Sequence, residues 1–114
     1  MMADSSTLIN FLIDFFKKIP KEQIEQYVKE KKDLLPLIKE SLRKLALYLV
    51  KRFLQNNWHI IEEYLTDTDK LVNLIITVRP DLKDLFQRKE TLEWLYENVK
   101  RIYDFLYNFA WGTK

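Results

Sequence analysis

The stretch that decides the fold is residues 91–111, TLEWLYENVKRIYDFLYNFAW, because it combines a helical repeat with seven aromatic rings. Its apolar residues recur at alternating steps of three and four, the spacing of a helix that packs against other helices. They are Leu92, Leu95, Val99, Ile102, Leu106 and Phe109. Tyr96, Tyr103 and Ala110 flank this seam, and Tyr107 lies at its edge. We therefore expect most of the rings in the core, with tyrosine hydroxyls reaching the edge of the bundle.

Two rings of this stretch, Trp94 and Phe105, do not fit the seam. They lie eleven residues apart, about three helical turns, so they share one face with Asn98 and Arg101. In one interpretation a neighbouring element, such as the first helix, covers them. In the other, the four residues form an exposed partner-binding strip, because aromatic side chains and arginine are favoured at protein interfaces. Such a strip could equally stack unpaired bases.

Working back toward the N-terminus, prolines and polar residues divide the chain into further helices. An apolar repeat predicts a helix over residues 8–19, which Pro20 ends. Residues 20–32 have a narrow apolar stripe within polar surroundings, which is typical of a surface helix. A long, central helix is expected from Leu34 to about Gln55. At Asn56–Asn57 that helix either ends or bends before the next apolar run.

The remaining segments are also predicted to be helical. Residues 66–69, TDTD, are a strong helix start signal, and the spacing of the apolar residues in 71–78 favours a helix over a buried strand. Residues 80–88 predict a short helix whose buried side chains are Leu82, Leu85 and Phe86. Connections this short make neighbouring helices fold back on one another. We predict an all-α, compact, single-domain bundle of about five to seven helices over residues 1–114.

The composition excludes several kinds of site. The chain has no cysteine, so it offers no disulfide, thiolate ligand or cysteine nucleophile. His59 is the only histidine, which excludes sites that need two imidazoles, and Gly112 is the only glycine, so a Gly-rich phosphate loop cannot be built. We therefore expect no catalytic, cofactor-binding or metal-binding residues, and a protein that is not an enzyme.

Positive charge is concentrated in the first half of the chain. Residues 1–58 hold eleven Lys and Arg against seven acids, whereas residues 59–114 hold eight against ten. The exposed face of a helix over 39–52 explains this run without a function. Alternatively, the basic residues could contact phosphates in a nucleic-acid-binding accessory domain. The residues of that alternative are Arg43, Lys44, Lys51 and Arg101.

The apolar run Leu8–Phe16 is too short to span a bilayer and follows no basic segment. We therefore expect a cytoplasmic protein without a membrane partner. Abundant Lys, Glu, Ile and Leu with no Cys is typical of thermophilic proteins. Our leading hypothesis is a non-enzymatic helical protein-protein interaction module, or a small subunit of a larger assembly. Its partner is another protein or a second copy of the chain in a homodimer.

Overall fold

The computed structural model describes residue 14 and residues 17–112, and these residues contain five α-helices and no strand. The elements are α2 (Lys21–Glu30), α3 (Leu35–Arg43), α4 (Leu47–Leu65), α5 (Thr68–Val78), the 3-10 turns η1 (Pro80–Leu82) and η2 (Leu85–Gln87), and α6 (Lys89–Trp111). The radius of gyration is 13.9 Å, close to the roughly 13 Å expected of a compact chain of this length. The predicted compact all-α bundle is confirmed. The predicted helix over 8–19 lies largely outside the described residues.

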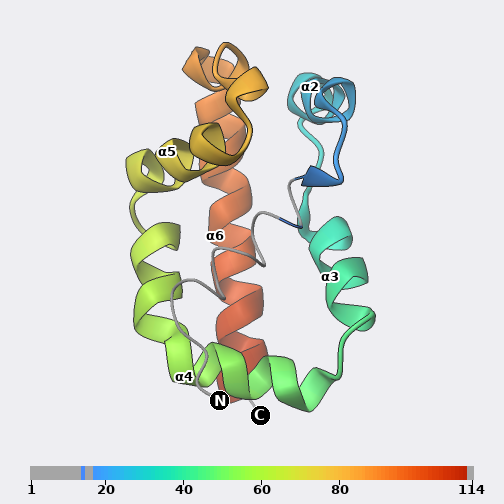
Figure 1. Cartoon of the computed structure of the whole chain (residues 1–114), viewed down its shortest axis with the longest axis vertical. Helices are drawn as coiled ribbons and strands as arrows, with labels where there is room; N and C mark the ends of the chain where they lie inside the picture. Colours follow the sequence, from blue (N-terminus) through green and yellow to red (C-terminus); the bar gives the residue numbers. More distant parts are fainter. Residues whose placement is uncertain (1–13, 15–16, 113–114) are drawn as a thin grey trace.

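The helix at the centre of the bundle is α6, the segment on which the sequence prediction was built. Figure 1 shows α6 running up the middle of the molecule, with α4 and α5 on one side and α2 and α3 on the other. The predicted seam of α6 is confirmed, because its six residues are all buried or half-buried. Since α6 has neighbours on both sides, its buried surface extends beyond that seam.

The core has two parts along α6. The larger part joins α2, α5, both 3-10 turns and the first half of α6, and it includes the predicted Leu82, Leu85 and Phe86. The smaller part lies between α4 and the end of α6, around Leu54, Ile61 and Ala110. Residues 80–88 therefore bury the side chains that the sequence predicted, although they form two 3-10 turns and not one short helix.

The predicted long helix over residues 34–55 is wrong, because the chain breaks between α3 and α4. Ala46, at the break, has an extended backbone with φ −69° and ψ 117°. No glycine or proline marks this position, so local sequence did not reveal it. The break lets α3 pack on one side of α6 while α4 turns toward the other side (Figure 1). It also leaves Leu45 and Leu49 46% and 53% exposed.

Within α4 the chain bends at Asn57 and does not end there, which decides between the two interpretations of Asn56–Asn57. The backbone of Asn57 has φ −120° and ψ 17°, outside the helical range. Its buried side chain donates a hydrogen bond from Nδ2 to the carbonyl of Phe53 at 2.9 Å. A side chain that satisfies a carbonyl inside the helix is a common cause of a bend. The bend precedes Trp58.

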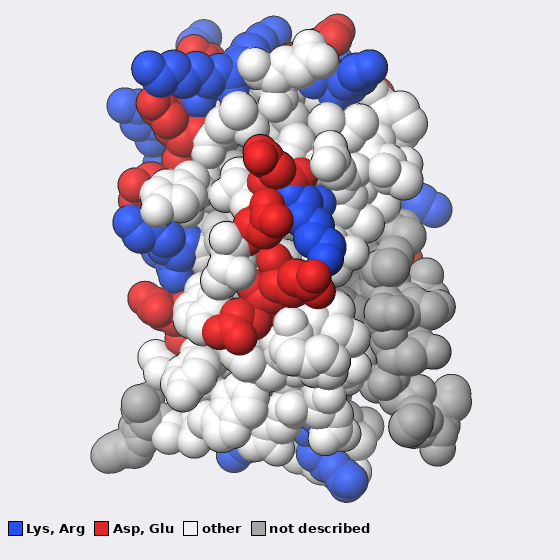
Figure 2. All heavy atoms as spheres, turned by 90° about the vertical axis from the view of Figure 1, so that its left-hand side faces the viewer, with Lys and Arg blue, Asp and Glu red and all other residues white. Residues whose placement is uncertain are grey.

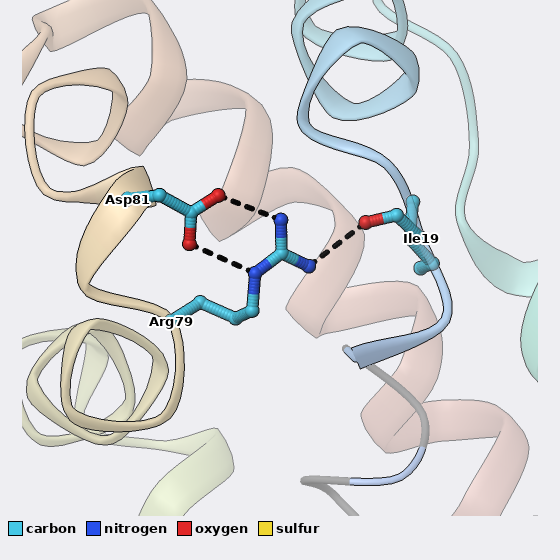
Figure 3. A network of polar contacts seen from close by, with 3 residues as sticks. All are labelled: Ile19, Arg79 and Asp81. Atoms are coloured by element: carbon cyan, nitrogen blue, oxygen red, sulfur yellow. Dashed lines mark hydrogen bonds and ion pairs between the residues drawn. The ribbon is translucent and has the colours of Figure 1, made fainter.

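Arg79 joins the end of α5 to the residue that precedes Pro20. Its Nε and Nη2 donate to the two carboxylate oxygens of Asp81 at 2.9 and 2.8 Å. Its Nη1 donates to the carbonyl of Ile19 at 2.8 Å, as Figure 3 shows. The hydrogen bond from Arg79 lowers the pKa of the Asp81 carboxyl below its ordinary value. This fork of hydrogen bonds holds together segments about sixty residues apart in the chain.

Candidate partner-binding surface

Trp94 and Asn98 do not lie on an exposed strip, because their side chains are only 7% and 1% exposed. The indole Nε1 of Trp94 donates to the carbonyl of Lys32 at 2.8 Å. The Oδ1 atom of Asn98 accepts from the backbone N–H of Leu34 at 2.6 Å. These bonds satisfy backbone groups of the α2–α3 connection, which has no helical partner there. The covering element is therefore this connection, and for these two residues the structure decides for the interpretation in which a neighbouring element covers them.

The other two residues of the expected strip are more accessible. Phe105 is half-buried, and its ring lies edge-on to Phe109 with 5.9 Å between centroids. The ammonium group of Lys39 lies 5.3 Å from the centroid of Phe105, so α3 contributes a cation to this ring. Arg101 is exposed. Because Trp94 and Asn98 are buried, Phe105 and Arg101 alone do not form a continuous aromatic surface.

The exposed aromatic surface lies on a different face of α6. Tyr103, Tyr107 and Trp111 follow one another at steps of four and therefore share one face. Tyr107 and Trp111 are each 45% exposed, although we expected Tyr107 at the edge of the core. Trp58 of α4 contacts all three rings edge-on, at centroid distances of 5.4, 5.7 and 5.3 Å. Tyr96, also predicted beside the seam, is 53% exposed two turns earlier on α6.

Two carboxylates accompany these rings. The hydroxyl of Tyr103 donates to Oε2 of Glu62 at 2.6 Å. This hydrogen bond raises the pKa of the Tyr103 phenol, because only the neutral form can donate it. Asp104, next along α6, is exposed and lies about one turn before Tyr107. We name this set the acidic aromatic face, and its members are Trp58, Glu62, Tyr103, Asp104, Tyr107 and Trp111.

The backbone beneath the acidic aromatic face is held in place. Trp58 of the face packs against the smaller part of the core, around Leu54, Ile61 and Ala110. Nε2 of Gln55 donates to the carbonyl of Ala110 at 2.5 Å, satisfying one of the free carbonyls at the end of α6. Gly112, with φ +63°, ends the helix, and its N–H donates to the carbonyl of Asn108 at 2.7 Å. The rings are therefore positioned before any partner binds.

The side of the molecule next to this face is acidic. Residues 59–78 contain four acids, and Lys70 is the only Lys or Arg among them. Lys70 forms an ion pair with Glu63 at 2.5 Å, and that hydrogen bond raises the pKa of Lys70. Figure 2 looks at the side formed by α4 and α5 and shows acidic side chains gathered along its middle, with uncharged surface below. A cationic partner would meet a favourable potential here.

The residues of the nucleic-acid alternative are all exposed but lie on different elements. Arg43 and Lys44 lie at the end of α3, Lys51 lies in the second turn of α4, and Arg101 lies near the middle of α6. The acidic aromatic face was not among the surfaces predicted from the sequence. The signal that could have found it was the row of aromatic residues at steps of four near the end of α6, with an acid inside it.

Other kinds of site receive no support from the described residues. Among residue 14 and residues 17–112, no three His, Asp or Glu side chains are placed to hold a metal ion together. In the same part of the chain, no helix has both the length and the apolar character needed to cross a membrane. Comparisons with protein-family models, curated proteins and solved structures found no match to the chain.

Proposed function

We propose that this protein is a non-enzymatic helical interaction module, or a small subunit of a larger assembly, that binds a protein partner through the acidic aromatic face. The observation that carries the proposal is the exposure of Tyr107 and Trp111, each 45%, within the cluster of four rings around Trp58. Tyrosine and tryptophan dominate the binding energy of protein interfaces, since they offer large contact area with few rotatable bonds. We also propose that the protein and this partner are cytoplasmic.

The charges of the face favour a particular kind of partner segment. Glu62 and Asp104 border the rings, and residues 102–111, the last part of α6, contain no Lys or Arg. Lysine and arginine side chains can lie over tryptophan and tyrosine rings while pairing with neighbouring carboxylates. The partner segment that fits is therefore one that carries Lys or Arg together with apolar side chains.

This function is tested with synthetic amphipathic peptides that carry Arg and Leu at helical spacing, together with matched peptides in which Gln replaces Arg. We expect the Arg peptides to bind and to change the fluorescence of Trp58 and Trp111, with affinity that falls as salt rises. A face variant, Glu62→Lys with Asp104→Lys, should bind at least about tenfold more weakly. A second face variant, Asp104→Lys with Tyr107→Ser, leaves the Tyr103–Glu62 hydrogen bond in place.

The matched control is Lys100→Ala, which changes an exposed residue of α6 outside the face. It should bind the Arg peptides as the unchanged protein does. Urea denaturation of each variant checks that the fold is intact. Equal binding of Arg and Gln peptides, or binding that both face variants retain in full, would refute the proposed function.

Nucleic-acid binding is the second candidate, and it rests on the exposed cations Arg43, Lys44 and Lys51. Of the exposed apolar and aromatic side chains between them, Tyr48 can stack on a base. Leu45, Leu47 and Leu49 can neither pair with phosphates nor stack on bases, which favours this candidate less. Fluorescence anisotropy with labelled single- and double-stranded oligonucleotides at low salt tests it. Binding that salt weakens, and that charge reversal at these three positions removes, would support this candidate instead.

A further inference from the structure

A second exposed apolar surface lies where α3 meets α4. Residues 43–49 are seven consecutive exposed residues. Among them Leu47, Tyr48 and Leu49 are 53%, 68% and 53% exposed. We name the surface the basic apolar corner, and its members are Arg43, Lys44, Leu45, Leu47, Tyr48, Leu49, Lys51 and Arg52.

The charge of this corner is the opposite of that of the acidic aromatic face. Residues 41–61 contain four Lys and Arg and no Asp or Glu. The corner thus has the chemistry that the proposed function requires of a partner segment, namely cations interleaved with apolar side chains. Of the seven large apolar or aromatic side chains that are exposed in the described part of the chain, six belong to the corner or to the face.

We propose that the partner is a second copy of this chain, with the corner of each copy docked on the acidic aromatic face of the other. This inference rests on the proposed function, since it names the occupant of the same face. Arg43, Lys44, Lys51 and Arg52 then lie opposite carboxylates and ring faces, and the exposed leucines lose their contact with water.

The two surfaces lie close enough together for both to be used in one closed dimer. Both involve α4, which carries Leu47 of the corner and Trp58 of the face, eleven residues apart. At 1.5 Å per residue this is about 16 Å along one helix. In a two-fold dimer the contact of corner with face is made twice, because each copy offers both surfaces to the other. The dimer therefore buries both exposed apolar surfaces at once.

Anionic ligands would satisfy only part of the two surfaces. A nucleic acid would pair with the four cations but would leave the leucines of the corner without a partner. A vesicle with anionic lipids would accept both, but it would leave the acidic aromatic face exposed and would repel its carboxylates. A second copy accounts for both surfaces with one kind of contact, made twice.

Sedimentation velocity of the full chain over about a hundredfold range of concentration tests the proposal. We expect a dimer that dissociates as the protein is diluted or as salt is raised. The corner variant Arg43→Glu with Lys44→Glu and Lys51→Glu, and the face variant Glu62→Lys with Asp104→Lys, should each weaken dimerisation at least about tenfold. If Glu62→Lys disturbs the fold, Asp104→Lys with Tyr107→Ser replaces it.

Mixing the two variants is the decisive measurement. A mixed dimer regains one intact contact, between the unchanged face of the corner variant and the unchanged corner of the face variant. In its other contact the charges have exchanged sides, so that Glu faces Lys and Arg43 is absent. The mixture should therefore dimerise more tightly than either variant alone and less tightly than the unchanged protein. As a matched control, Lys29→Glu with Lys83→Glu reverses exposed charges outside both surfaces and should dimerise like the unchanged protein.

Three outcomes would overturn the proposal. They are an unchanged protein that stays monomeric at every concentration, a mixture no tighter than its components, and an assembly that keeps growing beyond the dimer. A monomeric protein whose corner binds oligonucleotides or phosphatidylserine vesicles would assign the corner to that ligand instead. Titrating the corner variant with the Arg peptides distinguishes failure of the dimer proposal from failure of the proposed function. Peptide binding without dimerisation leaves the face a binding site, and absence of both refutes the two together.

Discussion

At the scale of single residues, Asn98 shows how one buried side chain can place a connection between helices. Its Oδ1 accepts from the N–H of Leu34, and its Nδ2 donates to the carbonyl of Trp94 at 3.0 Å. In sequence it resembles any polar residue on the outer side of α6. Its burial follows from the position of the α2–α3 connection, which brings an unpaired backbone N–H toward it.

We predict that Asn98→Leu lowers the free energy of unfolding by about 2–4 kcal/mol, because it leaves the buried N–H of Leu34 without an acceptor. Urea denaturation followed by circular dichroism measures this loss. The matched control is Asn108→Leu, which changes an exposed asparagine of the same helix and should stay within about 0.5 kcal/mol. Equal losses at the two positions would contradict the role given to Asn98.

The Tyr103–Glu62 hydrogen bond predicts a dependence of stability on alkaline pH. The folded pKa of Tyr103 is raised above its ordinary value of 10.0. Its contribution to stability is therefore fully present below about pH 10 and is lost as pH rises through the folded pKa. Tyr103→Phe should be less stable than the unchanged protein at pH 8, and the difference should shrink as pH rises above 10. Urea denaturation at several pH values checks this, and a constant difference would contradict it.

At the scale of elements, the sequence predicted the start of α5 but not the break that begins α4. The signal at residues 66–69 is confirmed, since Asp67 caps α5 by accepting from the N–H of Lys70 at 3.1 Å. The break at Ala46 and the bend at Asn57 were missed or left open. A cap is a local hydrogen bond and can be predicted from neighbouring residues, whereas a break without Gly or Pro depends on what each half packs against.

We predict that Asp67→Ala lowers the free energy of unfolding by about 1 kcal/mol, because the first turn of α5 loses its side-chain acceptor. Asp67→Asn keeps an acceptor oxygen at the same place and should retain most of that stability. Thermal and urea denaturation of the pair measures both effects. A loss in Asp67→Asn as large as in Asp67→Ala would show that charge, and not the cap, is what matters there.

At the scale of the whole molecule, Arg79 connects parts of the chain that no helix joins. Besides its other interactions, it bonds Asp81 and the carbonyl of Ile19. We predict that Arg79→Met lowers the free energy of unfolding by about 1–3 kcal/mol, since hydrogen bonds to a charged donor are lost. Arg79→Lys should recover only part of this free energy of unfolding, because an ammonium group cannot reproduce the planar arrangement of donors on the guanidinium group.

Stability measured at low pH gives an independent test of the ion pair between Arg79 and Asp81. The folded pKa of Asp81 is lowered from 3.8, so its contribution to stability is present above that value and is lost as pH falls through the lowered pKa. The stability difference between the unchanged protein and Arg79→Met should therefore narrow below about pH 4. A difference that stays constant down to pH 2 would contradict the Arg79–Asp81 pairing.

The sequence by itself determined the helical class, the seam of α6, the cap of α5 and the burial of residues 82, 85 and 86. These features depend on spacing and on hydrogen bonds between near neighbours, both of which can be read along the chain. Tertiary structure decided which of the other rings reach solvent. Because α6 has neighbours on two sides, its buried arc extends to Trp94 and leaves Tyr107 and Trp111 exposed. A helical repeat states how residues are arranged around one helix, but the packing of the others decides which of its faces remain open.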